Sequence, residues 1–453
     1  MPESNKSSPV CPLEYRYGRE EMKTIFTEAN KLQKFLDVEA ALAEAHAELG
    51  NISKDDAWRI KSSANLNSIS VEDVNAIEKV IKHDVMAVVK ALSNKCGKAG
   101  ESVHLGATSN DIIDCATALQ LKEAIGLIMK ALEALKKSLF NLAEKHKNTI
   151  MVGRTHGQFA VPITLGLKMA VFASEVQRHI TRLEESRERI LVGKMTGAVG
   201  TGAALGEQAL QIQDIVMKKL GLKAEEASFQ IVGRDRYIEF ISILANIATS
   251  LEKFATEVRN LQRSEINEVS EAFDVKKQVG SSTMAHKKNP IVSENICGLA
   301  RIVRSFLFPA FENNVLWHER DLTNSSAERF IIPHACILVD DILFKMRDVF
   351  DNLVVYPEIM RRNLESSQGL IMAESVMMVL TKKGVGRQEA HEIVRNCAMK
   401  ATMEEIGFPD ALAENDIVSQ TLSKEELEVA LNPENYTGKA VEIVENLLKK
   451  YGD

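Results

Sequence analysis

A short segment, residues 280–290, gathers the residue types that acid–base chemistry on a carboxylate substrate requires. It reads Gly-Ser-Ser-Thr-Met-Ala-His-Lys-Lys-Asn-Pro. The glycine permits backbone angles that other residues avoid, Ser281 offers a hydroxyl, and Lys287 offers positive charge. Asn289 and Pro290 are typical of a helix start, where free amides and the helix dipole attract an anion. The segment predicts either a loop that binds a carboxylate beside an activated serine, or a solvated linker with ordinary surface charge.

Residues 104–111 have a similar character. They place His104 and the hydroxyls of Thr108 and Ser109 directly ahead of a long helical pattern. One interpretation is a helix N-terminus that binds a carboxylate through its amides and hydroxyls. The other is that Ser109 or Asp111 caps the helix and does nothing more.

Residues 153–158 hold an arginine and His156 between glycines. Because imidazole titrates near neutrality, His156 is a candidate general acid or base. The alternative is a turn whose histidine only bonds the backbone. Pro162 follows shortly and is expected to begin a long helix.

Other clusters are weaker taken singly. Residues 16–19 (Arg-Tyr-Gly-Arg) are basic and aromatic. Residues 82–84 (Lys-His-Asp) are expected inside a helix over 71–94. Residues 317–329 contain arginines and serines that suit a phosphate or carboxylate. The first is more often surface decoration, the histidine of the second is more often a structural residue, and the charges of the third suit a self-paired solvated face equally well. Residues 193–202 are rich in glycine, but they follow a helix and lack the ending of a phosphate loop, so tight turns explain them.

Composition narrows the class of protein. The 453 residues are 45% hydrophobic and 26% charged, with only 5% aromatic residues, which favours a helical protein with a large core. A net charge of −7 gives no general attraction to nucleic acid or to an anionic membrane. The six cysteines form no Cys-x-x-Cys pair, and neither a signal peptide nor a membrane-spanning run is evident. We therefore expect a cytoplasmic protein with reduced thiols.

Apolar residues recur with helical spacing along most of the chain. Helices are expected over 22–49, 54–63 and 71–94, and after Pro290 with a break near Pro309. Three apolar seams recur at steps of three and four: Leu121, Ile125, Ile128, Leu132, Leu135, Leu139 and Leu142; Leu165, Met169, Phe172, Val176, Ile180 and Leu183; Leu244, Ile247, Leu251, Phe254, Val258 and Leu261. No alternation is long enough to require a sheet.

These patterns predict an all-α fold of three helical domains, with long central helices in a bundle. The expected boundaries are 1–105 for an N-terminal domain, 106–350 for a central domain that carries the loop 275–290, and 351–453 for a C-terminal domain. Because the apolar seams are longer than one subunit is expected to cover, we also expect an oligomer.

Five of these segments together resemble the adenylosuccinate lyase family of the fumarase/aspartase superfamily, and the resemblance covers nearly the whole chain. They are residues 82–84, 104–111, 153–158, 280–290 and 317–329. Residues 104–111, 153–158 and 280–290 correspond to the three regions shared across that superfamily. Residues 82–84 and 317–329 narrow the resemblance to this branch. The resemblance implies a homotetramer whose central helices form one bundle, active sites shared between three subunits, and no metal or organic cofactor.

The resemblance also implies a reaction and a set of residues. The reaction is carbon–nitrogen cleavage that releases fumarate from adenylosuccinate, or from succinylated imidazole-carboxamide ribotide (SAICAR), in purine nucleotide biosynthesis. Ser281 is implied as general base and His156 as general acid, oriented by Glu294. The residues implied to hold the succinyl carboxylates are Lys287, Asn289, Thr108 and Ser109. Those implied for the phosphate end and the rest of the pocket are Arg16, Tyr17, His83, Asp84, His104, Gln230, Arg320, Ser325 and Arg329.

One position departs from the family pattern, because Ala285 stands where proline is usual; we expect a looser loop that closes more slowly. The runner-up functions within the superfamily are argininosuccinate lyase and a cycloisomerase, neither of which needs the phosphate-binding set. The alternative from another class of function is a relative of the superfamily that has a structural role and no turnover, as lens crystallins do. The joint presence of the implied catalytic residues argues against that last reading.

Overall fold

The structure of the protein is a computed structural model that describes residues 9–273, 283–284 and 287–452. It divides into two compact units, each made of three stretches of chain. The first unit contains residues 1–132, 179–251 and 298–344, and the second contains 133–178, 252–297 and 345–453. Because these stretches alternate along the sequence, several helices begin in one unit and end in the other.

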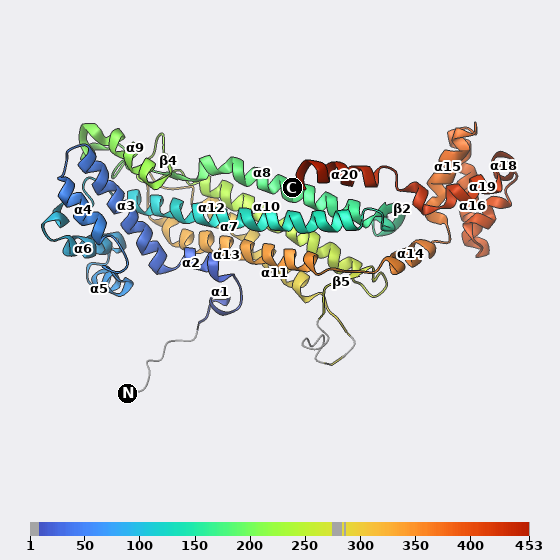
Figure 1. Ribbon diagram of the computed structural model, residues 1–453, viewed down its shortest axis with the longest axis horizontal. Helices are drawn as coiled ribbons and strands as arrows, with labels where there is room; N and C mark the ends of the chain where they lie inside the picture. Colours follow the sequence, from blue (N-terminus) through green and yellow to red (C-terminus); the bar gives the residue numbers. More distant parts are fainter. Residues whose placement is uncertain (1–8, 274–282, 285–286, 453) are drawn as a thin grey trace. The chain divides into compact units, whose positions relative to one another are not determined.

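Five of these helices are the framework of the chain (Figure 1): α7 (Ser109–Lys145), α8 (Leu165–Ile190), α10 (Asp235–Leu261), α11 (Ile291–Ser305) and α13 (Thr323–Asp351). Every residue of the three predicted apolar seams, which lie on α7, α8 and α10, is buried. The spacing of apolar residues at steps of three and four places them on one face of each helix, and burial of that face stabilises the helix. The all-α fold class is confirmed.

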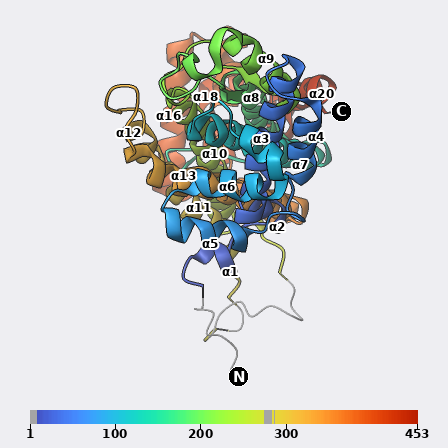
Figure 2. The ribbon, with the colours of Figure 1, turned by 90° about the vertical axis from the view of Figure 1, so that its left-hand side faces the viewer.

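Short helices form the rest of the first unit, and α3, α4 and α6 gather around one apolar core (Figure 2). The helices and strands are α1 (Pro12–Tyr15), α2 (Glu20–Ile25), α3 (Glu28–Glu48), α4 (Lys54–Ser63), α5 (Val71–Ile81), α6 (Asp84–Cys96), α9 (Ala209–Leu220), α12 (Leu307–Glu312), the parallel pair β3 (Val192–Gly193) and β4 (Lys223–Ala224), and the 3₁₀ helices η1 (Gly97–Ser102) and η2 (Ala203–Gln208).

The second unit has its own aromatic and C-terminal cores. Phe172 of α8 stacks on Phe254 of α10 with ring centroids 4.3 Å apart, and Phe350 of α13 packs beside both. A separate core joins α15, α16, α17 and α18. The remaining elements are β1 (Ile150–Thr155), β2 (Gln158–Thr164), β5 (Val269–Ser270), β6 (Val354–Val355), α14 (Pro357–Glu365), η3 (Leu370–Met372), α15 (Ala373–Lys382), α16 (Arg387–Glu404), α17 (Phe408–Ala413), α18 (Asp416–Thr421), α19 (Lys424–Leu431), η4 (Pro433–Tyr436) and α20 (Ala440–Tyr451).

The helix predicted over 71–94 is two helices, α5 and α6. Lys82 ends α5 in the left-handed conformation (φ 56°), and His83 caps α6 because its Nδ1 accepts the N–H of Met86 at 3.4 Å. The prediction that residues 82–84 lie inside one helix is therefore wrong. Neither glycine nor proline stands at the break, so the sequence carries no local signal for it.

The helix predicted over 22–49 is also interrupted, because α2 ends at Ile25 and Thr27 caps α3 by accepting the N–H of Asn30 at 3.2 Å. The predicted break near Pro309 is confirmed, since α11 ends at Ser305 and α12 begins at Leu307.

The expectation that no sheet is needed is wrong, because the described residues form three two-stranded sheets, which pair β1 with β2, β3 with β4, and β5 with β6. Strands β1 and β2 form an antiparallel hairpin in which Met151 pairs with Ile163 and Thr155 with Gln158. Pro162 lies in β2 instead of beginning a helix, and α8 starts three residues later. A two-stranded hairpin has free edges, where a proline without an N–H is tolerated.

Within the described residues, no helix is both long enough and apolar enough to cross a membrane. The division into three consecutive domains with boundaries near residues 105 and 350 stays a prediction.

Candidate active site

The first turn of α7 carries two of the predicted substrate-binding residues, Thr108 and Ser109. The carboxylate of Asp111 accepts the backbone N–H of Thr108 at 2.8 Å, and the N–H of Asp111 donates to the Thr108 carbonyl at 2.9 Å. A side chain at the third helical position that bonds back to the N-cap amide is one half of a capping box. Of the two predicted capping residues, Asp111 is therefore the one that closes this turn.

This arrangement leaves the other donors of the turn available. Within the described residues, the hydroxyls of Thr108 and Ser109 have no hydrogen-bond partner. The backbone N–H groups of Ser109 and Asn110 have none either. Both hydroxyl-bearing residues are half-buried. The helix behind them is 37 residues long, so its dipole adds positive potential at this end. The turn has the donors that a carboxylate requires.

His104 lies just before this turn and is held by an acid. Its Nδ1 is 2.6 Å from an Oε1 of Glu39, which is buried in α3, and its backbone is in the left-handed region (φ 62°). Burial lowers the pKa of the His104 imidazole, but the hydrogen bond and charge of Glu39, with the charge of Asp111, raise it above its ordinary value.

Gln230 and Arg320 meet in the first unit as predicted residues of the pocket. Nη1 of Arg320 donates to Oε1 of Gln230 at 3.0 Å, and the Gln230 N–H donates to the Glu319 carbonyl at 3.3 Å. Nε of Arg320 is buried without a partner among the described residues. Burial and the nearby charge of Arg234 lower the pKa of Arg320. Its guanidinium thus has donor capacity left for a ligand.

A buried ion-pair cluster holds the segments that carry these residues. Arg234 donates to both carboxylate oxygens of Asp114 (2.9 and 3.1 Å) and to Glu328 at 2.8 Å. Asp114 also accepts the N–H of Val232 at 2.9 Å. Because Glu328 is the neighbour of Arg329 on α13, one cluster joins α7, the segment around Gln230 and the start of α13.

The predicted phosphate-end residues lie at the surface of the first unit. Arg329 donates to Asp84 at 2.9 Å, and both line a cavity of about 240 Å³ together with Lys31. Lys31 is a second basic residue beside Arg329. Burial and the charge of Arg329 lower the pKa of Lys31. His83 caps α6 next to Asp84.

The other predicted members of this set belong to the same unit, at the end of α1 and the start of α13. Arg16 is exposed at the C-terminal end of α1, Tyr17 follows it half-buried, and Ser325 is half-buried in the first turn of α13.

In the second unit, His156 occupies the tip of the β1–β2 hairpin and is exposed. His156 (φ 53°) and Gly157 (φ 75°) both have positive φ, as the two-residue type I′ turn of a hairpin requires. Next to the tip, Arg154 fixes the hairpin, because its guanidinium bonds both carboxylate oxygens of the fully buried Glu268 at 2.7 and 3.0 Å. A rigid hairpin thus presents an exposed imidazole.

The start of α11 differs from its prediction. The helix begins at Ile291, and the carboxylate of Glu271 accepts the N–H groups of Ser293 at 2.7 Å and Val292 at 3.2 Å. The prediction of free amides at this helix start is therefore wrong, because a carboxylate of the chain itself already occupies them. Glu294, predicted to orient His156, is exposed in the first turn of the same helix.

The loop before α11 is described only in part. Lys287 is exposed and Asn289 is half-buried, and the N–H of Lys287 donates to the Met284 carbonyl at 3.1 Å. Ser281, the predicted general base, and Ala285 lie outside the described residues.

Comparison with known proteins places the chain in a family. Residues 14–305 match the lyase family, and residues 369–447 match the adenylosuccinate lyase C-terminus. An adenylosuccinate lyase from Pyrococcus abyssi is 53% identical over 439 residues, which is 97% of each chain. One from Methanocaldococcus jannaschii is 49% identical over 98% of this chain and 97% of its own. The chain belongs to the adenylosuccinate lyase family.

Solved structures agree on the fold. A fumarate lyase from Mesorhizobium sp. BNC1 superposes with a TM-score of 0.88 at 33% identity, covering 95% of this chain and 98% of that one. A 3-carboxy-cis,cis-muconate lactonizing enzyme from Pseudomonas putida gives 0.87 at 33% identity, covering 97% and 98%. As a member of the adenylosuccinate lyase family, the protein is an enzyme, a carbon–nitrogen lyase.

Several residues that shape this site escaped the sequence analysis. They are buried acids and bases: Glu39, Asp114, Lys194, Arg234, Glu268 and Glu271. Each acts through a partner far along the chain; Arg154 and Glu268, for instance, are 114 residues apart. The only available signal was a charged residue inside an otherwise apolar helical pattern, such as Glu39, since such a residue is rarely buried unless it is paired.

Proposed function

We propose that the protein cleaves adenylosuccinate to AMP and fumarate, and SAICAR to its amine product and fumarate, in purine nucleotide biosynthesis. The observation that carries this proposal is the 53% identity to an adenylosuccinate lyase over 97% of both chains. At such identity and coverage, a different substrate would require changes concentrated in the site. All the residues implied by the family resemblance are present in the sequence.

The proposed chemistry is a β-elimination. Ser281, as an alkoxide whose charge Lys287 stabilises, removes a proton from the succinyl carbon beside a carboxylate. The electron pair is held in that carboxylate as a doubly negative intermediate. When the carbon–carbon double bond of fumarate forms, the carbon–nitrogen bond breaks, and His156 gives its proton to the departing nitrogen. Glu294 orients His156 in this scheme.

The substrate carboxylates are proposed to bind where donors are left over. Thr108 and Ser109 offer hydroxyls that have no hydrogen-bond partner in the described part of the chain, at the positive end of α7, and Lys287 and Asn289 supply the remaining contacts. Donors that strengthen as negative charge grows lower the barrier directly.

The phosphate end is proposed to bind to Arg16, Tyr17, His83, Ser325 and Arg329 of the first unit, which offer basic groups and hydroxyls. Arg329 has an exposed guanidinium that bonds Asp84 through one nitrogen, so its other donors remain for a phosphate. His104, Gln230 and Arg320 complete the pocket.

We propose that the enzyme is a cytoplasmic homotetramer with active sites shared between subunits. Large apolar side chains are exposed between α12 and the start of α13: Phe308, Phe311, Val315, Trp317, Leu322 and Phe330. An apolar surface of this kind supports burial against another copy of the chain. Light scattering after size-exclusion chromatography tests this directly, and a monomer would contradict it.

Substitution of the acid and the base tests the reaction. We expect Ser281→Ala and His156→Ala to lower kcat at least 10³-fold while AMP still binds. Fumarate release, followed by ultraviolet absorbance with adenylosuccinate and SAICAR, is the measurement. Matched controls are Ser282→Ala, the adjacent hydroxyl, and His391→Ala, an exposed histidine of α16. Near-normal turnover by either catalytic variant, or cleavage of argininosuccinate instead, would contradict the proposal.

A further inference from the structure

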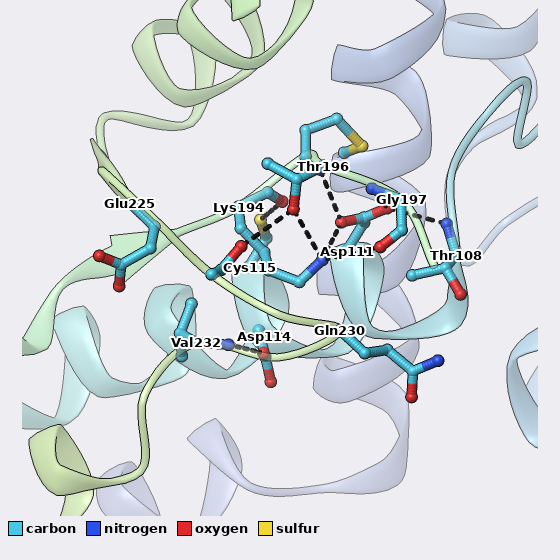
Figure 3. A network of polar contacts seen from close by, with 12 residues as sticks. Thr108, Asp111, Asp114, Cys115, Lys194, Thr196, Gly197, Glu225, Gln230 and Val232 are labelled. Atoms are coloured by element: carbon cyan, nitrogen blue, oxygen red, sulfur yellow. Dashed lines mark hydrogen bonds and ion pairs between the residues drawn. The ribbon is translucent and has the colours of Figure 1, made fainter. Parts of the chain in front are cut away.

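The first turn of α7 is backed by an ion pair that the reaction scheme does not use. Lys194 and Asp111 form a salt bridge, and the side chains of both are fully buried (Figure 3). Lys194 is among the largest fully buried side chains of the protein. Removing two charges from water is costly, and a buried pair often stabilises a fold less than apolar residues of the same volume. A buried lysine at this position therefore needs an explanation beyond stability.

Asp111 is the centre of the network. One carboxylate oxygen contacts Lys194 Nζ and accepts the N–H of Thr196 at 3.0 Å; the other accepts the N–H groups of Gly197 at 3.1 Å and Thr108 at 2.8 Å. The carboxylate thus ties the glycine-rich segment after β3 to the turn that carries Thr108 (Figure 3). Three backbone amides hold the carboxylate. Lys194 adds a positive charge to them, and its Nζ also donates to the Thr196 hydroxyl at 3.3 Å and the Gly197 carbonyl at 3.5 Å.

That charge matters because of where Asp111 lies. A carboxylate in the first turn of a helix offsets the positive end of the dipole and repels a second anion. The start of α11 shows the outcome, since Glu271 fills that site and has no ion-pair partner among the described residues. At α7, Lys194 cancels the charge of Asp111. The turn can therefore be capped and still attract an anion.

We propose that Lys194 is a positioning residue that neutralises Asp111, so that the first turn of α7 keeps its affinity for a substrate carboxylate. The inference rests on the proposed function, because it takes Thr108 and Ser109 as the carboxylate-binding residues. It assigns Lys194 no contact with substrate. It predicts that Lys194 affects the carboxylate end of the ligand and not the phosphate end.

Separate titrations of the two products test this prediction. Fumarate carries the carboxylates and AMP carries the phosphate, so calorimetry with each reports on one end of the site. In Lys194→Met, which keeps the length of the side chain but not the charge, we expect fumarate to bind about tenfold more weakly or worse, and AMP to bind within about twofold of the wild-type value. Equal weakening of both products, or unchanged binding of fumarate, would overturn the inference.

A matched control separates charge at the site from loss of any buried lysine. Lys136 is also buried, and its Nζ donates to Gln177 at 3.0 Å in the second unit. Lys136→Met is expected to leave the affinity for both products unchanged. If it weakens fumarate as strongly as Lys194→Met does, the effect is general and the inference fails.

Variants of Asp111 supply a test that does not depend on an unpaired buried carboxylate. Asp111→Asn combined with Lys194→Met leaves a neutral turn, whereas Asp111→Asn alone leaves one positive charge. We expect fumarate to bind more tightly to the single variant than to the double variant, and more tightly to the double variant than to Lys194→Met. Equal fumarate affinity of the single and double variants would overturn the inference, even if Lys194→Met does not fold.

Turnover by the wild-type protein is measured alongside these titrations. Absence of adenylosuccinate cleavage with the predicted order of fumarate affinities would contradict the proposed function alone. Normal cleavage with fumarate affinities that ignore the charge at residues 111 and 194 would contradict only the present inference.

Discussion

The helix starts of α7 and α11 look alike in sequence and differ in structure. Both are preceded by residues that predict an anion site, and both have an acid close to the first-turn amides. At α11 the acid is Glu271, whose carboxylate takes the N–H groups of Val292 and Ser293. At α7 the acid is Asp111, which bonds the N-cap amide and is paired with Lys194. A helix start is available to a ligand only where an anion of the chain has not already filled its first-turn amides.

This difference assigns separate tasks to the two sites. The start of α7 is suited to hold a carboxylate of the substrate. The start of α11 is suited to hold its own helix in place, because Glu271 anchors it and Gln262 bonds the Lys288 carbonyl at 3.2 Å. In the proposed scheme, Lys287 and Asn289 act on the substrate through their side chains, without help from the helix amides.

Among the changes that compare the two helix starts, the largest expected effect is at the hydroxyls of α7. We expect Thr108→Val combined with Ser109→Ala to lower kcat/KM with adenylosuccinate at least about 100-fold, because each hydrogen bond to a charged group contributes about 1.5–3 kcal/mol. The matched control is Ser293→Ala, which removes a buried hydroxyl from the first turn of α11 that has no partner among the described residues. A comparable loss in the control would remove the distinction between the two helix starts.

A moderate effect is expected at Glu271. In Glu271→Gln the amide nitrogen faces backbone N–H groups, so one hydrogen bond is lost and the free energy of unfolding should fall by about 1–3 kcal/mol. Denaturant unfolding measures this loss. Glu265→Gln, at an exposed acid close by in sequence, is expected to change stability by less than about 0.5 kcal/mol. If fumarate binds Glu271→Gln more tightly than it binds the wild type, the start of α11 binds a ligand once the charge of Glu271 is removed.

The smallest effect is expected from Glu39, and it depends on pH. Because Glu39 raises the pKa of His104 above its ordinary value, the pair stabilises the fold at acidic pH, and this contribution is lost as pH rises through the raised pKa. The melting temperature of the wild type should therefore exceed that of Glu39→Gln most near pH 6, by a few degrees, and the gap should narrow toward pH 9. A gap that widens with pH would contradict this assignment.

Much of the helical framework could be predicted from sequence because its causes are local. The seam from Leu121 to Leu142 lies on one face of one helix, and the break near Pro309 follows from a missing N–H. The break at Lys82 could not be predicted, since a left-handed lysine leaves no mark in composition. The hairpin at His156 was missed because its strands are short and contain glycine and proline.

The residue types of the candidate site could be predicted from the sequence. The hydrogen-bond and ion-pair partners of those residues could not. Thr108, Ser109 and His156 could be singled out by chemistry and by resemblance to a family. Whether a helix start is free depends on the fold: Asp111 meets Lys194 from 83 residues away, and Glu271 reaches Ser293 from 22 residues away. Such pairings are set by packing of distant segments, on which the sequence pattern is silent.

A crystal structure of the protein with fumarate bound tests the central claim most directly. We predict a carboxylate of fumarate within hydrogen-bond distance of the Ser109 hydroxyl and the first-turn amides of α7, with Glu271 still bonded to Val292 and Ser293. A carboxylate bound at the amides of Val292 and Ser293, with Glu271 displaced, would contradict the account.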